Sequence, residues 1–442
     1  MTAFAFIGPN VVAEGSWIID DTGGDCELIG VWDPATLTCI LSGNVFDTIE
    51  IASDGITLDG DGYTLSTETL TYGIKAIARS GITITNLAVN GFSNGIYFYT
   101  TSGSAVTGNS FSYNNIGIYM LSSSDGNTLS GNEFTDNFWA VFLHGSTGNT
   151  IGGNTFVGND YAGIQISLAD GNTVSGNTLS DNDILAITLY KSNGNTITGN
   201  TLSNNHYNIN LEISDYNTIS GNTATGGTLV GLYLKLSEGN TVSGNEAINN
   251  HFGFSMDDST DNAIFGNTFS YNTYGIYVGG SPGNTLFHNN IVENTDQLWD
   301  DGSSNTWDNG EGEGNYWNDY LGEDLDGDGV GDTLLPHQTV DWYPLMSPWS
   351  PDPFEDIEKL KSYIYGLEIG KGIKNSLIKQ LEAAENALSN GHEHTAVNIL
   401  NAFINHVESL MEEQKLTEEQ AQYMIASALK IIGLIEGTDS SP

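Results

Sequence analysis

The sequence predicts a mainly β protein, a right-handed parallel β-helix (solenoid) of 22–23 residues per coil, followed by a small C-terminal α-helical bundle. Three observations predict it. The motif Gly-Asn-Thr-x-x-Gly-Asn, as at 126–132, recurs along the chain with a nearly constant step. Each copy is followed by an apolar segment that alternates with period two, as in a strand with one buried face. After Pro353, glycine becomes rare and apolar residues take the spacing of helices.

The repeat unit identifies the type of solenoid. A unit this short cannot bury its own apolar residues, so it must stack on its neighbours. Three short apolar segments separated by Gly and Asn predict three short strands per coil. Because parallel crossovers are almost always right-handed, we expect a right-handed helix. The Leu-x-x-Leu-x-Leu frame of a leucine-rich repeat is absent. We expect the Asn side chains to stack into ladders at the corners. The first Asn of successive copies is Asn127, Asn149, Asn172, Asn195, Asn217, Asn240, Asn262 and Asn284.

Changes in composition divide the chain into segments. We expect roughly eleven regular coils with a cap at each end, because open strand edges would otherwise promote association. The helical module should fold independently of the rod. The expected segments are an N-terminal cap with a disulfide loop (1–53), the parallel β-helix (54–298), a C-terminal cap with an acidic loop (299–346), a proline-rich linker (347–354), the helical bundle (355–436) and a tail (437–442).

The charge of the chain excludes two classes of partner. With a formal net charge of −44, the protein would be repelled by nucleic acid and by anionic membrane surfaces. The chain lacks an apolar run of about 18 residues, so we expect that it does not span a membrane. Residues 1–13 hold a short apolar run without a preceding basic segment, and we do not expect a complete signal peptide there.

The chain has two cysteines, Cys26 and Cys39, which flank a turn-rich loop. We expect them to form a disulfide that stabilises the fold by about 3 kcal/mol in the chain-entropy model. A pair of buried free thiols is the alternative. A disulfide favours an oxidising environment, so we expect an extracellular, cell-surface or periplasmic location.

Three motifs close the repeat region: Gly314-Asn-Tyr-Trp-Asn-Asp-Tyr320, the Asp-Gly-Asp-Gly-Val-Gly-Asp-Thr segment at 326–333, and Tyr343-Pro-Leu-Met346. Together with the repeats they resemble NosD-type β-helix proteins, a family that includes a periplasmic copper-binding accessory of nitrous oxide reductase. The broader class resembles carbohydrate-binding and sugar-hydrolysing β-helix domains. Ala396–Val407 and Lys415–Gln420 resemble the FIMAH helical module of secreted proteins. The resemblance implies the fold strongly and the function weakly, because one scaffold hosts unrelated sites.

The outward residues of one strand in each coil form columns that contain several aromatic rings. Aromatic rings with polar neighbours on a flat face suit stacking against sugar rings, so we predict glycan binding there. The alternative is that tyrosine is common in strands and stacks on itself. The predicted glycan-binding residues are Tyr97, Tyr119, Phe142, Tyr190, Tyr233 and Tyr277.

A column of corner residues offers a candidate catalytic group. Asp160, Asp183 and His206 should lie on successive coils, about 4.8 Å apart, where carboxylates and an imidazole can bind a cation or exchange protons. The alternative is an exposed polar corner without a catalytic or cation-binding role. A lyase of this fold would use a basic residue, and residues 80–350 contain only Lys191 and Lys235, which does not favour that mechanism.

The acidic segment after the repeats has the spacing of a calcium loop. Asp324, Asp326, Asp328 and Asp332 stand at positions 1, 3, 5 and 9, with glycines at the tight turns. Leu335 at position 12 excludes a complete EF-hand. The alternative is a solvated acidic turn. We therefore expect calcium as a cofactor and no organic cofactor. A copper site of the NosD kind is less favoured, because the methionines are scattered along the chain.

The leading hypothesis is a secreted or cell-surface β-helix protein that binds or organises glycan or extracellular matrix without catalysis. One alternative is a polysaccharide-processing enzyme (lyase, hydrolase or epimerase) that uses the same outward face. Another is a structural surface-layer or filament subunit, and a NosD-like copper accessory is less favoured. The expected partners are polysaccharides or cell-surface glycans, with other surface proteins or further copies of the chain as alternatives.

Overall fold

The computed structural model describes residues 16–67, 72–350, 353–367 and 369–436. Contacts divide the chain into two compact units, Met1–Trp349 and Ser350–Pro442, and each is described by itself. The first fifteen residues of the expected cap, part of the expected linker and the expected tail lie outside the described residues.

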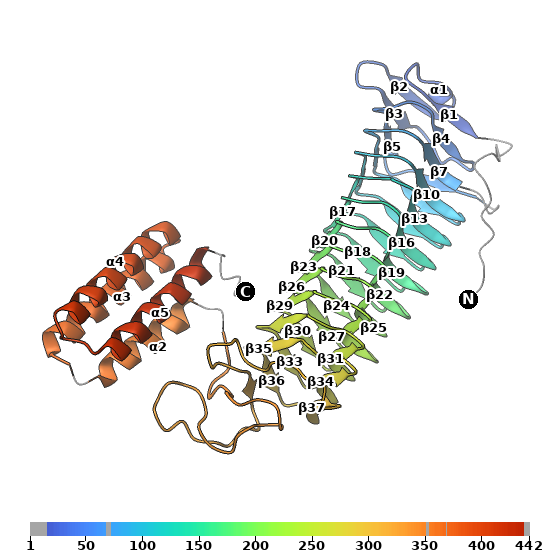
Figure 1. Ribbon diagram of the computed structural model, residues 1–442. Helices are drawn as coiled ribbons and strands as arrows, with labels where there is room; N and C mark the ends of the chain where they lie inside the picture. The colour runs from blue at the N-terminus through green and yellow to red at the C-terminus, as the bar shows by residue number, and fades with distance from the viewer. Residues whose placement is uncertain (1–15, 68–71, 351–352, 368, 437–442) are drawn as a thin grey trace. The chain divides into compact units, whose positions relative to one another are not determined.

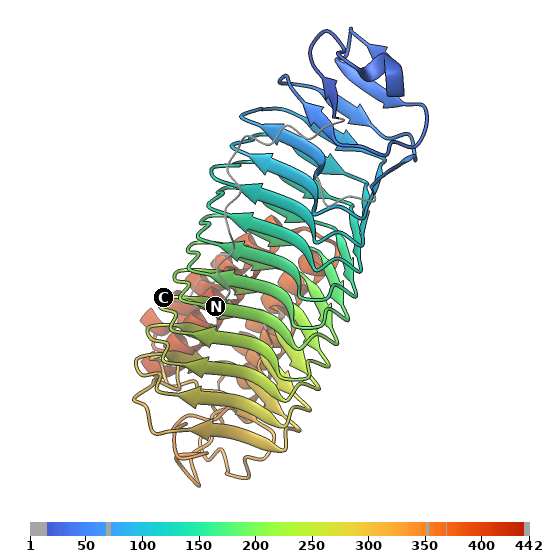
Figure 2. The same cartoon turned by 90° about the vertical axis from the view of Figure 1, so that its right-hand side faces the viewer.

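The first unit is a right-handed parallel β-helix, as the sequence predicts, built of three sheets of 13, 13 and 12 strands (Figure 1). Sheet A, which Figure 2 turns toward the viewer, contains the longest strands, and most of these have six residues. Its strands are β1 (Trp17–Ile19), β4 (Ile49–Ile51), β7 (Tyr72–Ile77), β10 (Asn94–Tyr99), β13 (Ile116–Leu121), β16 (Trp139–His144), β19 (Ala162–Ser167), β22 (Leu185–Tyr190), β25 (Tyr207–Glu212), β28 (Val230–Lys235), β31 (Phe252–Asp257), β34 (Tyr274–Gly279) and β37 (Asp296–Asp300).

Sheets B and C carry the repeated motif and the short strand that follows it. Sheet B consists of β2 (Gly30–Asp33), β3 (Thr38–Leu41), β5 (Thr57–Asp59), β8 (Thr83–Thr85), β11 (Ala105–Thr107), β14 (Thr128–Ser130), β17 (Thr150–Gly152), β20 (Thr173–Ser175), β23 (Thr196–Thr198), β26 (Thr218–Ser220), β29 (Thr241–Ser243), β32 (Ala263–Phe265) and β35 (Thr285–Phe287). Sheet C consists of β6 (Thr64–Ser66), β9 (Ala88–Asn90), β12 (Ser110–Ser112), β15 (Glu133–Thr135), β18 (Thr155–Val157), β21 (Thr178–Ser180), β24 (Thr201–Ser203), β27 (Thr223–Thr225), β30 (Glu246–Ile248), β33 (Thr268–Ser270), β36 (Asn290–Val292) and β38 (Tyr316–Trp317).

The core of the rod consists of columns of apolar side chains, one from each successive coil. Ile118, Ile164 and Ile276 point inward from sheet A and are 0% exposed. In sheet C, Phe134 stacks between Phe111 and Phe156 with ring centroids 4.9 Å and 4.8 Å away. These distances equal the spacing of neighbouring strands, so each coil stacks its apolar residues directly on those of the coil before.

Ladders of buried Asn join the coils at the corners, which confirms the expected role of the motif. In each ladder the backbone N–H and the side-chain amide of one Asn donate to the side-chain oxygen of the Asn one coil later. Asn149 donates in this way to Asn172 at 2.9 Å and 3.0 Å. A buried Asn whose amide groups are all paired both satisfies the polar corner and fixes the register between coils.

The N-terminal cap is part of the sheets themselves. Strands β1 and β4 form the first two strands of sheet A, and the antiparallel pair β2 and β3 ends sheet B. Stacking therefore begins before residue 54, ahead of the first coil that the repeat pattern indicates. The predicted disulfide between Cys26 and Cys39 is present and joins the short helix α1 (Cys26–Ile29) to β3.

The C-terminal end of one ladder closes on a carboxylate. Asn289 donates to Asn315, and the backbone N–H of Asn315 donates to Oδ2 of Asp341 at 2.9 Å. The same oxygen accepts the indole N–H of Trp317 at 2.8 Å, and Oδ1 accepts the backbone N–H of Tyr343 at 2.9 Å. Asp341 is 0% exposed. Burial raises its pKa, whereas these donors lower it.

The second unit is the predicted helical bundle, with α2 (Pro353–Gly366), α3 (Lys371–Ser389), α4 (Glu393–Glu412) and α5 (Glu418–Glu436) packed around Leu381 and Phe403. The expected capping box precedes α5, where Thr417 and Gln420 each accept the other's backbone N–H. Among the helices of the described residues, none is both long enough and apolar enough to cross a membrane.

Candidate functional site

The outward face of sheet A carries the predicted columns. In a strand such as β10, residues 1, 4 and 6 point outward and residues 2, 3 and 5 point into the core. We call the aligned outward positions the first, fourth and sixth rows. Backbone pairing places the fourth row in register along ten successive strands. Its members are Tyr97, Tyr119, Phe142, Gln165, Thr188, Asn210, Tyr233, Ser255, Tyr277 and Trp299.

The sequence reasoning missed the first row, which lies beside the fourth and adds rings to the face. Its members are Tyr72, Asn94, Ile116, Trp139, Ala162, Leu185, Tyr207, Val230, Phe252 and Tyr274. Two consecutive inward residues separate the first row from the fourth. A search for strictly alternating inward and outward residues therefore does not find the first row. The signal that would have found it is the aromatic or aliphatic residue immediately before the Gly or Ala of most of these strands.

The rings gather in two patches, and the N-terminal patch lies on β7 to β16. The ring of Tyr119 stacks on Phe142 with centroids 5.1 Å apart and planes 11° apart. Trp139 packs beside Phe142, and Tyr97 lies between Tyr72 and Tyr119. Burial in this cluster raises the pKa of Tyr97 to about 12, so its hydroxyl is a neutral hydrogen-bonding group.

The C-terminal patch lies on β25 to β37. Tyr277 and Trp299 stack with nearly parallel rings, whose centroids are 4.2 Å apart and whose planes differ by 7°, and Trp299 is 40% exposed. Phe252 packs edge-on against Tyr277. The hydroxyl of Tyr233 donates to Oδ2 of Asp257 at 2.7 Å. Burial and this hydrogen bond raise the pKa of Tyr233.

Uncharged polar side chains fill the space between the patches. The side-chain oxygen of Gln165 accepts the indole N–H of Trp139 at 2.9 Å, and the amide of Asn210 donates to the hydroxyl of Thr188 at 2.9 Å. A polar stretch three coils long thus interrupts the aromatic column of the fourth row.

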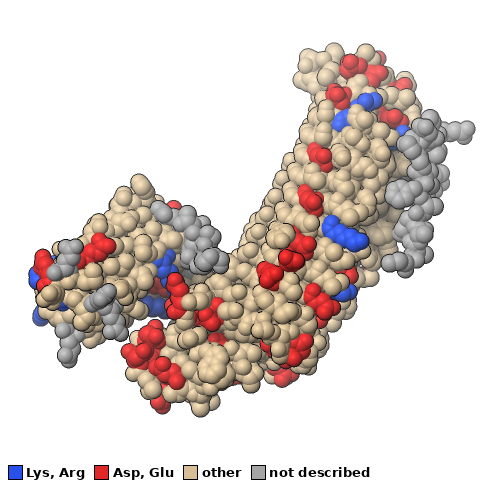
Figure 3. All heavy atoms as spheres, in the orientation of Figure 1, with Lys and Arg blue, Asp and Glu red and all other residues tan. Residues whose placement is uncertain are grey.

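The sixth row differs from the other two because it carries charge. It reads Tyr99, Leu121, His144, Ser167, Tyr190, Glu212, Lys235, Asp257 and Gly279. Lys235 forms an ion pair with Glu212 at 3.1 Å and is flanked on the next coil by Asp257. Lys and Arg are sparse and Asp and Glu frequent on the face shown in Figure 3. Tyr190, one of the predicted glycan-binding residues, belongs to this row, and the ammonium of Lys191 lies 5.3 Å from its ring.

Asp160, Asp183 and His206 stack in the predicted order. Each follows a residue of one Asn ladder, whose members there are Asn159, Asn182 and Asn205. Asp160 and Asp183 are exposed, and Nδ1 of His206 lies 2.6 Å from the hydroxyl of Thr228. The structure therefore shows a stacked corner, and a catalytic role for it stays a prediction.

The acidic loop brings three of its four predicted ligands together. Single oxygens of Asp324, Asp326 and Asp332 lie within 4.8 Å of one another, the one such group of His, Cys, Asp or Glu in the described part of the chain. Asp324 accepts the backbone N–H groups of Gly327 and Gly329 at 2.6 Å and 2.9 Å. Both glycines have positive φ, so the turn requires them. Asp328 stands outside the group and accepts the N–H of Val330.

The residues present do not fit a copper centre. Copper(I) prefers thiolate, thioether and imidazole ligands in a cluster. The two cysteines are joined in the disulfide, and Met120 and Met256 are 0% exposed in the rod core. Among the His, Cys, Asp and Glu of the described residues, the one group that could hold a metal ion consists of carboxylates and contains no imidazole or thiolate.

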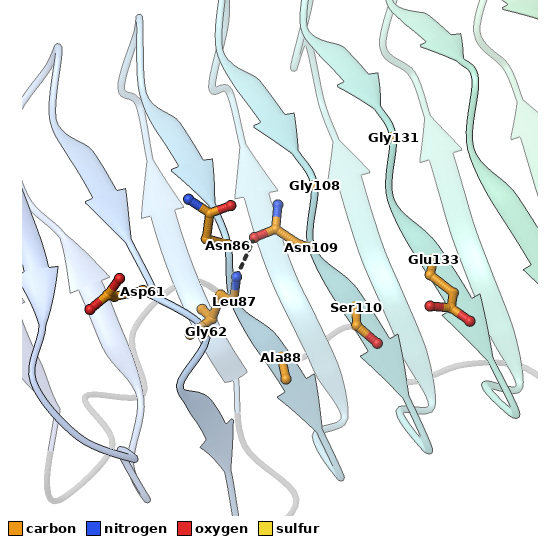
Figure 4. A pocket seen from close by; sticks show the side chains of 10 residues that line it. All are labelled: Asp61, Gly62, Asn86, Leu87, Ala88, Gly108, Asn109, Ser110, Gly131 and Glu133. Carbon is orange, nitrogen blue, oxygen red and sulfur yellow. Dashed lines mark hydrogen bonds between the residues drawn. The ribbon is translucent and has the colours of Figure 1, made fainter.

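A shallow depression lies at the corner between sheets B and C (Figure 4). Its floor is glycine and ladder backbone, where the N–H of Leu87 donates to Asn109 at 3.1 Å. Asp61 and Glu133 lie at opposite ends of the residues drawn in Figure 4. It holds no aromatic ring, so the face of sheet A is the stronger candidate site.

Comparisons with known proteins agree with the fold. The model of a family described as "Periplasmic copper-binding protein (NosD)" matches residues 37–209 and 185–322, and the FIMAH domain model matches residues 354–433. None of the curated proteins compared with the chain matches it.

Solved structures that are similar include the Dettilon tailspike protein (gp208), 15% identical over 65% of this chain and 70% of that chain, with a TM-score of 0.52. The A-module of mannuronan C-5 epimerase AlgE4 from Azotobacter vinelandii is 14% identical over 66% and 88% of the two chains, with a TM-score of 0.46. DFA-IIIase from Arthrobacter chlorophenolicus A6 is 13% identical over 61% and 85%, with a TM-score of 0.47.

Proposed function

The chain belongs to the NosD family of β-helix proteins, and we propose that it binds glycan on the outward face of sheet A, outside the cytoplasm and without converting the glycan chemically. The observation that carries this proposal is the pair of aromatic patches held in register on rigid strands. Rings fixed by packing lose little entropy when a ligand stacks on them, which favours binding. The disulfide and the periplasmic description of the family support an extracytoplasmic location.

Copper binding, which the family description names, is not part of this proposal. The cysteine sulfurs are joined in the disulfide, Met120 and Met256 are buried in the rod core, and two histidines of the rod have other neighbours: His206 contacts Thr228, and His288 pairs with Glu313. A scaffold shared within a family does not fix the chemistry of the site that it carries.

Glycan binding predicts that Trp299→Ala weakens retention on the polysaccharide that the protein binds. Trp299 is the most exposed ring of the C-terminal patch, and removing an exposed aromatic anchor should weaken affinity at least about tenfold, equivalent to about 1.4 kcal/mol. Affinity electrophoresis through a panel of neutral and acidic polysaccharides measures this.

Trp342→Ala is the matched control, since Trp342 is 57% exposed but belongs to the C-terminal cap. Equal weakening by both variants would show that the patch is not the binding site. Retention on none of the polysaccharides, with or without calcium, would instead favour the structural or filament role.

A second candidate function, polysaccharide processing, is favoured by one observation. The charged residues of the sixth row, Glu212, Lys235 and Asp257, lie beside the rings of the C-terminal patch. Carboxylates flanking a bound sugar can act as acid and base. The same panel, assayed for new reducing or unsaturated ends, tests it. Products that disappear in Glu212→Gln and Asp257→Asn would replace the binding role with a catalytic one.

We propose further that calcium occupies the acidic loop and orders the C-terminal cap. Four carboxylates within nine residues repel one another, so a bound cation stabilises the folded state by about 2.7 kcal/mol at a hundredfold excess over its dissociation constant. We expect calcium to raise the melting temperature, and magnesium to raise it less, because magnesium demands tighter octahedral geometry.

The grouping in the loop sharpens this test. Asp326→Asn should abolish the calcium effect because Asp326 belongs to the group of three, whereas Asp328→Asn should retain most of it. Differential scanning calorimetry in calcium, magnesium and chelator gives the comparison. Identical melting curves in calcium and in chelator would mean that the loop is a solvated turn.

A further inference from the structure

A band without charge runs along sheet A. The first row from Tyr72 to Tyr274 and the fourth row from Tyr97 to Trp299 contain no Asp, Glu, Lys or Arg. The chain as a whole carries 55 acidic residues and a net charge of −44. On this sheet, charged residues border the band: Lys75, paired to Glu50, lies before it, Asp296 pairs with Tyr274 after it, and the sixth row lies beside it.

The band has three parts with a definite spacing. Phe142 ends the N-terminal patch and Tyr233 lies in the C-terminal patch, four strands further along the sheet. At about 4.8 Å per strand the two rings are about 19 Å apart along the rod. Gln165, Thr188 and Asn210 lie between them. Gln165 and Asn210 are partly exposed and offer uncharged amide groups, whereas Thr188 is buried and accepts the amide of Asn210.

The spacing matches an extended glycan. One pyranose unit lengthens an extended β-linked chain by nearly the same amount as one coil lengthens the rod, about 4.8 Å. A chain parallel to the rod axis therefore presents one sugar to each coil. Its outer sugars meet rings in both patches, and the hydroxyls of its middle sugars meet the polar stretch. A charged chain would enter a strongly negative field without a countercharge in the band.

We propose that the band binds one uncharged, extended, β-linked polysaccharide chain along the rod axis and that this chain spans both aromatic patches. This deepens the proposed glycan-binding function and rests on it. It requires that a hexasaccharide reaches both patches, whereas a disaccharide reaches only one.

The experiment uses isothermal titration calorimetry with fragments of β-1,4-glucan, β-1,4-mannan and β-1,4-xylan, and with oligogalacturonate as the charged counterpart. For at least one neutral series we expect the hexasaccharide to bind about a hundredfold more tightly than the disaccharide, because the second patch is engaged within the same complex. Oligogalacturonate of equal length should bind more weakly than that neutral hexasaccharide.

One variant separates a continuous site from two independent ones. Asn210→Arg places a bulky charge between the patches and leaves every ring in place. We expect it to reduce hexasaccharide affinity to nearly the level of the disaccharide, which a single patch can bind. Leu236→Arg, at an exposed residue just after β28, is the control, and melting curves establish that both variants are folded.

The outcomes distinguish this inference from the function on which it rests. Binding of a polysaccharide with no dependence on chain length, an unaffected Asn210→Arg variant, or a preference for oligogalacturonate overturns the inference while glycan binding stands. Binding of none of the polysaccharides in the panel overturns both.

Discussion

Replacing Ile164 with Asp is expected to abolish cooperative folding of the rod. Ile164 lies in the middle of β19, is 0% exposed, and is stacked between Val141 and Ile187 of the neighbouring strands. The rod interior offers it no basic partner, because the core cluster of the described residues consists of apolar side chains. An unpaired carboxylate there loses its hydration, which costs several kcal/mol and is comparable to the whole stability of many domains.

Gln165→Asp is the matched control for this substitution. Gln165 is the next residue of β19, and its side chain points outward. The change disturbs the hydrogen bond accepted from Trp139 and removes the one donated to Ser167, and it should cost about 2 kcal/mol. Circular dichroism against temperature measures both variants. If they lost equal stability, the assignment of inward and outward faces in sheet A would be wrong.

The fold of the rod was predictable because the sequence pattern that specifies each coil is local and recurs along the chain. Each copy of the motif places an Asn at a corner and an apolar residue in the core, so the same inference is tested many times within one chain. The first strands, β1 and β4, escaped because they hold three residues each and come before any copy of the motif. Their place in sheet A depends on pairing with distant strands, which no local pattern encodes.

The candidate site was predictable only in part. The fourth row could be read from the sequence because its residues recur with the repeat, and the pairing confirms its alignment. The first row was missed because it needs two consecutive inward residues, which depart from the simple alternation of a strand. The acidic spacing identified four carboxylates, but the fold of the loop, which turns Asp328 to Val330, decides which three converge.

The Asn ladder that ends at Asp341 has a direction, and the direction explains why a carboxylate stands at its end. From each Asn to the next, the donor lies on the earlier coil: Asn267 donates to Asn289, and Asn289 donates to Asn315. The side-chain amide of Asn289 also donates back to the backbone carbonyl of Ile264. The last Asn therefore needs a pure acceptor. An ionised Asp is one, and the alignment of many amide dipoles behind it favours its negative charge.

Asp341→Ala is accordingly expected to destabilise the C-terminal cap by about 3 kcal/mol or more. It leaves the N–H groups of Asn315, Trp317 and Tyr343 buried without an acceptor, and each such group costs about 1–3 kcal/mol. Asp341→Asn keeps one acceptor oxygen but turns an amide toward one of the donors, so it should cost less than the alanine variant. Chemical unfolding followed by tryptophan fluorescence measures the loss.

Glu311→Ala, at an exposed acidic residue of the same cap, is the control. A loss for Asp341→Ala no larger than for this control would show that the ladder does not depend on its terminal acceptor.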